Sequence, residues 1–197
     1  MKTYYDRRAA EYDEWYCGLG RFAPDDRPGW AAELEELERV LRDLPPARTL
    51  DVACGTAFLT RCLRGAVVCL DQSPGMLGIA RARLPGADFV EHDALARLPF
   101  PDGAFDRVFT GHFYGHLATA ERSAFLAEAR RVGRELVVID SAPRDGVEPE
   151  SYQERTLNDG SRWEVYKRYF RAPELLAELG GGSVLFDGRW FVAVRTE

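Results

Sequence analysis

Two stretches of the chain hold residues that could do chemistry beside a bound small molecule. In TLDVACGTAFLTRCL, residues 49–63, the acid Asp51 lies in an apolar run that leads into a turn at Gly55, and a helix-like pattern follows. Ligands of open parallel sheets bind at the carboxyl ends of the strands, so such a turn is predicted to hold a ligand. In TGHFYGHLAT, His112 and His116 are two of only three histidines and are candidate general bases.

The residues of the first turn favour one kind of ligand. A dinucleotide fold would need G-x-G-x-x-G, with the pyrophosphate on the helix N-terminus, and this turn offers only Gly55. Asp51 precedes the turn, where a carboxylate would repel a pyrophosphate but could accept hydrogen bonds from backbone amides or, through water, from an ammonium group. The pattern favours a nucleoside with a cationic amino-acid tail. A nucleotide-cofactor oxidoreductase is the alternative.

This turn resembles the first motif of the class I S-adenosylmethionine-dependent methyltransferases, in which an acid is followed by alternating glycines. Asp51, Ala53, Gly55 and Ala57 occupy those positions, so the chain keeps the acid and the middle glycine and has alanine at the other two. Each methyl group crowds the backbone where the methionine part of the cofactor would approach. A non-catalytic relative that binds the cofactor as a sensor or scaffold therefore stays open.

Two further segments carry the same resemblance, which covers residues 47–140. VVCLDQSPGML places Asp71 where the family has an acid on the ribose hydroxyls, and FVEHDALARLPFPDGAFDRVF places Asp93 where the adenine amino group is met. Taken alone, Asp51 could cap a turn, and Asp71 could cap the following helix with Ser73. The resemblance implies S-adenosylmethionine as cofactor, with S-adenosylhomocysteine as product. The contacts it implies are Tyr12, Asp51, Ala53, Cys54, Gly55, Asp71, Gln72, Met76, Asp93, Ala94 and His112.

Methyl transfer is an in-line displacement from a sulfonium, so the enzyme mainly aligns the acceptor, and a base helps where the acceptor carries a proton. The segment after the fourth predicted strand should lie beside the sulfonium. In related small-molecule methyltransferases the residue at this place often touches the cofactor, which makes His112 the favoured cofactor contact and His116 the favoured base. Phe113 and Tyr114 could flank the sulfonium through cation–π contact, and packing in the core is the commoner alternative for such aromatics. Ordinary polar loop or capping roles are the alternative for both histidines.

No metal site is predicted. Two histidines four residues apart can mark a metal site on a helix, but no carboxylate or cysteine stands at a suitable spacing to complete one here. The catechol-type methyltransferases hold magnesium with an acid at the end of the fourth strand, and this chain has Thr110 and Gly111 there.

The elements that position these residues follow from hydrophobic periodicity. Strand-like and helix-like runs alternate, which predicts an α/β fold: a Rossmann-like, seven-stranded, mainly parallel sheet with an antiparallel last strand and helices on both faces. The strand-like runs are 48–53, 66–70, 87–91, 105–110 and 135–140, and the helix-like runs are 3–17, 30–44, 57–64, 74–83 and 120–132. The hairpin signal at Asp187-Gly188 should add the antiparallel edge.

The remaining segments are expected to form the substrate side of one methyltransferase domain, 1–197. Residues 1–30 resemble the opening lid of quinone-biosynthesis-type and sugar-amine methyltransferases, and 172–197 should form a helix and an edge hairpin. The insertion 141–171 carries a hairpin signal and many basic and aromatic residues. Such a hairpin suits an aromatic or acidic acceptor. A dimer contact or a solvated edge strand would explain it equally well.

Composition bounds the remaining possibilities. A chain of 197 residues suits a single domain, and its net charge of −6 argues against broad nucleic-acid binding. No apolar run approaches the ~20 residues that span a bilayer. The four cysteines show no C-x-x-C pairing and, with the preference for arginine over lysine, point to a cytoplasmic, bacterial protein. Without a large recognition domain, a small-molecule acceptor is favoured over a macromolecule, and a homodimer stays open.

Overall fold

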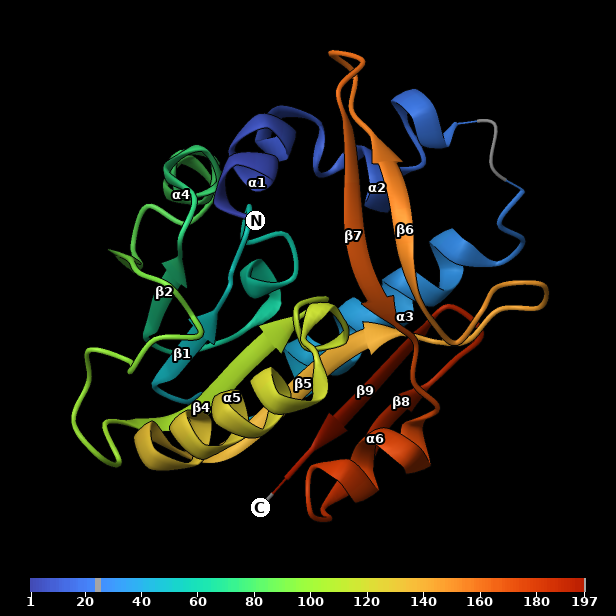
Figure 1. The fold of residues 1–197 in the computed structure, drawn as a ribbon. Coiled ribbons are helices and arrows are strands. Elements are labelled where there is room, and N and C mark those ends of the chain that lie inside the picture. Colours follow the sequence, from blue (N-terminus) through green and yellow to red (C-terminus); the bar gives the residue numbers. More distant parts are fainter. Residues whose placement is uncertain (24–25, 197) are drawn as a thin grey trace.

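The computed structural model describes residues 1–23 and 26–196, and its centre is one seven-stranded sheet (Figure 1). The strand order is β3-β2-β1-β4-β5-β9-β8, and β9 alone runs antiparallel to its neighbours. The predicted fold is therefore confirmed. The strands are β1 (Thr49–Val52), β2 (Val67–Asp71), β3 (Asp88–Glu91), β4 (Phe105–Gly111), β5 (Gly133–Ser141), β8 (Ser183–Asp187) and β9 (Phe191–Arg195).

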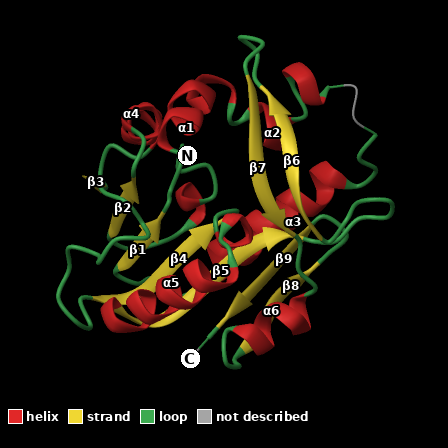
Figure 2. Cartoon of the chain, in the orientation of Figure 1, coloured by secondary structure: helices red, strands yellow, loops and turns green. Residues whose placement is uncertain are grey.

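Helices cover both faces of this sheet (Figure 2). Strands buried on both faces read as continuous apolar runs. In β5, Leu136 and Val138 belong to one buried cluster, while Val137 and Ile139 belong to the other. α5 (Thr119–Val132) and α6 (Ala172–Glu178) pack on the first face. α3 (Trp30–Asp43) and α4 (Pro74–Arg83) pack on the second.

Two expectations about local elements need correction. The helix predicted over 57–64 is only a 3₁₀ turn, η3 (Thr60–Cys62), because the chain before it takes left-handed conformations. The helix predicted over 3–17 is broken into α1 (Lys2–Arg8), η1 (Ala9–Glu11) and α2 (Glu14–Cys17). The hairpin predicted around Asp187-Gly188 is confirmed: β8 and β9 pair antiparallel and complete the sheet, with β8 outermost.

A two-stranded hairpin, β6 (Glu150–Thr156) and β7 (Arg162–Arg168), stands apart from the main sheet above the carboxyl ends of β4 and β5 (Figure 1). It contacts η4 (Tyr114–His116), the turn that follows β4. The two segments approach so closely at Gly115 that an added Cβ would lie 2.5 Å from the carbonyl oxygen of Arg168. Only glycine fits there. The insertion thus forms one wall over the carboxyl end of the sheet.

Successive residues of β7 alternate between an inward and an outward face, as their burial shows. Val165 and Lys167 are buried and Trp163 is half-buried, whereas Arg162 and Glu164, which point the other way, are exposed. In the part of the chain that the structure covers, no helix combines the length and the apolar character that crossing a bilayer requires. All four cysteines are free thiols.

Candidate functional site

A cavity of about 310 Å³ opens where β1, β2 and β4 end. This is where an open parallel sheet holds its ligands. Of the residues predicted to form the site, most line this cavity: Tyr12, Ala53, Gly55, Asp71, Gln72, Met76, Asp93, Ala94, His112 and His116. Asp51 and Cys54 line a smaller cavity beside it, together with Tyr12 and Ala53.

The turn after β1 alternates between left-handed and right-handed backbone. Ala53, Gly55 and Ala57 have φ angles of 59°, 55° and 58°. These are the three positions at which the family motif has alternating glycines. A left-handed conformation costs an L-residue with a Cβ roughly 1–2 kcal/mol. The two alanines therefore keep the backbone path of a glycine turn and hold it under strain, while Gly55, the middle position, lies unstrained under the ring of Tyr12.

Replacing Ala53 with glycine is expected to raise the free energy of unfolding by up to about 1 kcal/mol. The gain is the released left-handed strain minus the roughly 0.5–1 kcal/mol that glycine's extra freedom in the unfolded chain costs. Ala57→Gly should gain less, because its buried methyl group packs in a cluster with Cys69 and Ala80. Urea denaturation measures both. As a control, Ala31→Gly in the exposed first turn of α3 should lose about 0.5–1 kcal/mol. Equal losses at Ala31 and Ala53 would contradict the strain.

Asp71 ties the turn to the start of α4. At the end of β2, its carboxylate accepts hydrogen bonds from the backbone N–H groups of Gly55 and Ser73, each at 2.9 Å. Burial raises the pKa of Asp71, and the backbone donors only partly offset this effect. The side chain nevertheless reaches the cavity, and each carboxylate oxygen has a second lone pair for a ligand hydroxyl. The capping role and a binding role are therefore compatible, and Ser73 itself caps α4 through the N–H of Met76.

Asp51 is the most deeply buried acid of the predicted site. One carboxylate oxygen accepts a hydrogen bond from the Thr60 hydroxyl, and the other is buried without a partner among residues 1–23 and 26–196. Burial raises the pKa of Asp51 to about 8. An unpaired buried carboxylate oxygen is costly, so a polar group of a ligand, or a water beside it, would find a vacant acceptor there.

The N-terminal segment lies over the turn and closes one side of the cavity. The Thr56 hydroxyl donates to Asp13 at 2.6 Å, and Asp6 accepts from the N–H of Gly75 at 3.3 Å. Tyr5 and Tyr12 line the cavity from this side. Burial raises the pKa of Tyr12 to about 12, so its hydroxyl stays protonated at neutral pH. Residues 24 and 25 of the predicted lid segment, and residue 197 of the last one, lie outside the described residues.

His112 directly follows β4 and has a left-handed backbone, with φ of 57°. Its ring lies 4.8 Å from that of Trp15 and 5.7 Å from that of Phe191, centroid to centroid, and its Nδ1 is 3.4 Å from the Ser141 hydroxyl. Burial lowers the pKa of His112 to about 3. The imidazole is therefore neutral at physiological pH, and packing rather than proton transfer dominates its surroundings.

His116 is held so that one ring nitrogen is available as an acceptor. Nδ1 lies 2.7 Å from the carbonyl oxygen of Tyr166, and because a carbonyl only accepts, Nδ1 must carry the proton. Nε2 then has a free lone pair on a ring that borders the cavity. Burial, with the nearby charge of Lys167, lowers the pKa of His116 to about 3. The ring is thus a neutral acceptor at physiological pH.

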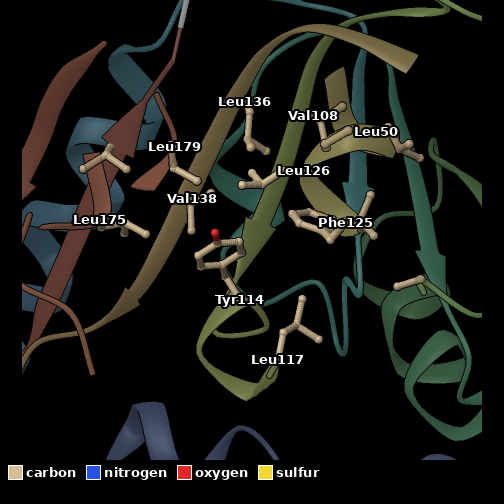
Figure 3. Close-up of a cluster of buried hydrophobic side chains, with 14 of the residues drawn as sticks. Leu50, Val108, Tyr114, Leu117, Phe125, Leu126, Leu136, Val138, Leu175 and Leu179 are labelled. Atoms are coloured by element: carbon tan, nitrogen blue, oxygen red, sulfur yellow. The ribbon is translucent and has the colours of Figure 1, made fainter. Parts of the chain in front are cut away.

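Tyr114 does not lie at the cavity, which corrects the expectation that it flanks a sulfonium. Its ring points into the cluster of leucines and Phe125 on the α5–α6 face of the sheet (Figure 3). Its hydroxyl donates to Glu178 of α6 at 2.8 Å. In the 3₁₀ turn η4, side chains three residues apart share a side, so Phe113 and His116 both line the cavity while Tyr114, between them, joins the core. Within the described ranges, no cluster of three or more metal-binding side chains is present.

Comparison with known proteins agrees with this geometry. Residues 50–136 match the family described as methyltransferase domain. Over 148 residues the chain is 33% identical to demethylmenaquinone methyltransferase of Thermotoga maritima, covering 71% of this chain and 60% of that protein. The solved structure of the DhpI–SAH complex aligns with a TM-score of 0.71 and 26% identity, covering 98% of this chain and 92% of that one. The chain belongs to the class I S-adenosylmethionine-dependent methyltransferases.

A second relative matches only part of the chain. Demethylmenaquinone methyltransferase of Thermus thermophilus is 44% identical over 110 residues, and the match covers 50% of this chain and 49% of that protein. The chain thus spans about half the length of that relative in the match.

A buried ion pair in this methyltransferase was not anticipated from the sequence. Asp140, at the end of β5, is bound by the ammonium of Lys167 from the hairpin, and their side chains are 0% and 4% exposed. The N–H of Gly115 donates to the same carboxylate at 2.7 Å. Burial would raise the pKa of Asp140, but the charge of Lys167 outweighs it, and the pKa is lowered. The one sequence feature that could have drawn attention to this pair is that Lys167 is one of only two lysines in the chain.

Proposed function

We propose that this chain binds S-adenosylmethionine and transfers its methyl group to a small-molecule acceptor. The observation that carries the proposal is one cavity in which the left-handed turn, Asp71 and Asp93 meet at the carboxyl ends of neighbouring strands. The three features arise from separate segments of the chain, and each has the chemistry that one part of this cofactor requires. The relatives bearing the name demethylmenaquinone methyltransferase support the same reaction class.

The place of each residue in the cavity assigns it to one part of the cofactor. Asp71 would accept hydrogen bonds from the ribose hydroxyls, and Asp93, with Ala94, would meet the adenine. Asp51 and the turn from Ala53 to Gly55 would hold the amino-acid end, because the unpaired oxygen of Asp51 faces that side. Gln72, Met76 and Tyr12 would enclose the nucleoside. Cys54 would contribute through its backbone, since its side chain packs beside Ala57 and Cys69.

The chemical step asks little of the protein beyond alignment. The bound cofactor supplies an activated methyl group on a sulfonium. Holding an acceptor in line with such a group can contribute about 7–11 kcal/mol in favourable cases. His116 would accept the proton of an acceptor that carries one, through its free Nε2. His112 would pack against the cofactor, and the N-terminal segment would act as a lid that excludes water.

The test of this proposal is calorimetric titration with S-adenosylmethionine, S-adenosylhomocysteine and NADH. We expect the first two to bind and NADH not to bind. Asp71→Asn should weaken cofactor affinity about 10- to 150-fold, because hydrogen bonds to a charged carboxylate are worth about 1.5–3 kcal/mol. The N–H groups of Gly55 and Ser73 bind different carboxylate oxygens of Asp71, so asparagine keeps an acceptor for only one of them. Urea denaturation of the variant must therefore accompany the titration, so that a loss of affinity is assigned to the ligand contact only where the fold is retained.

The matched control is Asp88→Asn, at the exposed start of β3 and outside the cavity lining. Its cofactor affinity should equal that of the wild type. Unchanged affinity in Asp71→Asn would remove the ribose assignment. Binding of NADH instead of S-adenosylhomocysteine would favour an oxidoreductase. Cofactor binding without turnover of any acceptor would point to a sensor or scaffold.

A further inference from the structure

A second, smaller cavity of about 60 Å³ adjoins the first and differs from it in charge. The two cavities share three lining residues, Tyr12, His112 and His116. The second is also lined by Arg8, Arg144, Arg155 and Lys167, and it has no acidic residue in its wall. Basic side chains from the N-terminal helix, the end of β5 and the hairpin thus converge on one point beside the carboxyl end of β4.

The three arginines of this cavity have neutral partners only. Arg8 donates to the Tyr4 hydroxyl at 2.7 Å, Arg144 to the Tyr169 hydroxyl at 2.8 Å, and Arg155 to the Gln153 side-chain oxygen at 2.6 Å. Within residues 1–23 and 26–196, none of them lies within ion-pair distance of a carboxylate. Elsewhere in the same structure, buried arginines have such partners: Arg107 pairs with Glu135, and Arg122 with Glu178.

The cationic groups of this cavity lie close enough to affect one another. Burial, and then the charge of Arg8, lower the pKa of Arg155, whereas the hydroxyls of Tyr4 and Tyr12 outweigh burial at Arg8 and its pKa is raised. The charge of Lys167 is already neutralised by Asp140. Like charges in a desolvated site are unfavourable unless an opposite charge joins them. An anion bound between Arg8 and Arg155 would supply that charge and would accept planar, two-pronged hydrogen bonds.

The register of the hairpin shows that the site is built into the fold. Arg155 pairs across the strands with Trp163, and Ser151 pairs with Lys167, so these residues share the inward face. Arg162 sits on the opposite face and is 73% exposed, with its charge directed to Glu154. A hairpin that was only a solvated edge would not need to turn a half-buried arginine toward the half-buried Arg8.

We propose that the acceptor is a small acid whose oxyanion group, a phosphonate, phosphate or carboxylate, binds between Arg8 and Arg155 with Arg144 at the rim. This inference rests on the proposed function, since it names the substrate class of that site. The bound oxyanion would hold the acceptor at the end of β4, beside His112, His116 and Tyr12, the three residues that line both cavities. Trp15 and Tyr169 would enclose the rest of a small molecule.

The experiment titrates inorganic phosphate, and acetate in parallel, into protein saturated with S-adenosylhomocysteine, at ionic strength held constant with sodium chloride. We expect saturable binding of one oxyanion. Arg155→Gln should weaken it about 10- to 150-fold, which corresponds to one charge-assisted contact. Affinity for S-adenosylhomocysteine should stay unchanged in this variant. The better of the two probes assigns the group as tetrahedral or as a carboxylate.

Arg162→Gln, on the outward face of the same hairpin, is the matched control and should bind the oxyanion as the wild type does. Protein that binds S-adenosylhomocysteine but neither oxyanion would overturn this inference and leave the proposed function standing. Equal weakening in Arg155→Gln and Arg162→Gln would also overturn it, as a general charge effect. Failure to bind S-adenosylhomocysteine at all would instead count against the proposed function. The free energy of unfolding of Arg155→Gln should equal that of the wild type, because the loss of an arginine with a structural role would lower it.

Discussion

Lys167→Met is expected to lower the free energy of unfolding by about 3–5 kcal/mol, because it leaves a buried carboxylate without its counter-charge. Asp140 is 0% exposed and is bound by the Lys167 ammonium from the hairpin. The remaining donors are backbone N–H groups, including that of Gly115 at 2.7 Å, and they do not carry a full positive charge. Urea denaturation of the variant and the wild type at neutral pH measures the loss.

The chain offers a matched control in its only other lysine. Lys2 pairs with Glu91 at 2.7 Å, but both side chains are about half exposed, at 49% and 50%. Lys2→Met should therefore leave the free energy of unfolding nearly unchanged. The double variant Asp140→Asn with Lys167→Met should regain much of the loss, because no charge is then buried alone. Similar costs at the two lysines would show that the Asp140 site is wetter than its burial indicates.

The same ion pair connects the fold to the site. It joins the hairpin to the end of β5 at the point where the carbonyl of Tyr166 accepts from Nδ1 of His116. A pair that costs 3–5 kcal/mol to break fixes the hairpin more firmly than the polar contacts at its tip. We therefore expect the orientation of His116 to depend on the buried pair of Asp140 in β5 and Lys167 in β7.

Much of the sheet could be predicted because its signals are local. Each core strand is an apolar run, and α4 begins with Ser73 and Pro74, a cap followed by a residue suited to the first turn. The positions of Asp71 and Asp93 followed from strand ends in the same way. The left-handed path at Ala53 and Ala57 follows the glycine pattern of the family, although propensity alone argues against it.

The parts that sequence reasoning missed depend on contacts between distant segments. Asp140 and Lys167 are 27 residues apart and meet only because the hairpin folds back over β5. Arg8 and Arg155 come together from the N-terminal helix and the hairpin, and nothing local distinguishes them from surface arginines. Tyr114 was misplaced for a similar reason. The conformation of one turn sets whether its ring faces the cavity or the core. The hydrogen bond to Glu178 and packing in the leucine cluster stabilise the core position.

His116→Ala is expected to lower turnover about 10²- to 10⁴-fold for an acceptor that must lose a proton, while cofactor affinity changes little. The reason is geometric. Nδ1 is occupied by the Tyr166 carbonyl, so Nε2 is the basic atom, and it faces the cavity shared with the acceptor site. Because the pKa of His116 is lowered to about 3, the ring stays neutral through the physiological range, and turnover should fall only as the pH approaches that value. So low a pKa also makes Nε2 a weak proton acceptor, so the loss of turnover should lie near the lower end of this range. Single-turnover kinetics with calorimetric cofactor titration separate the two effects.

His92→Ala is the matched control, since the third histidine lies outside the cavity lining and its Nε2 contacts the Arg97 carbonyl at 3.0 Å. Its turnover should equal that of the wild type. Equal losses of turnover and cofactor affinity in His116→Ala would show that His116 contacts the cofactor and does not act as a base. Full turnover in His116→Ala would contradict a base at this position and would fit an acceptor whose oxygen is already an anion, because such a nucleophile has no proton to lose. The same acid group that Arg8 and Arg155 are built to hold would then be the group that receives the methyl.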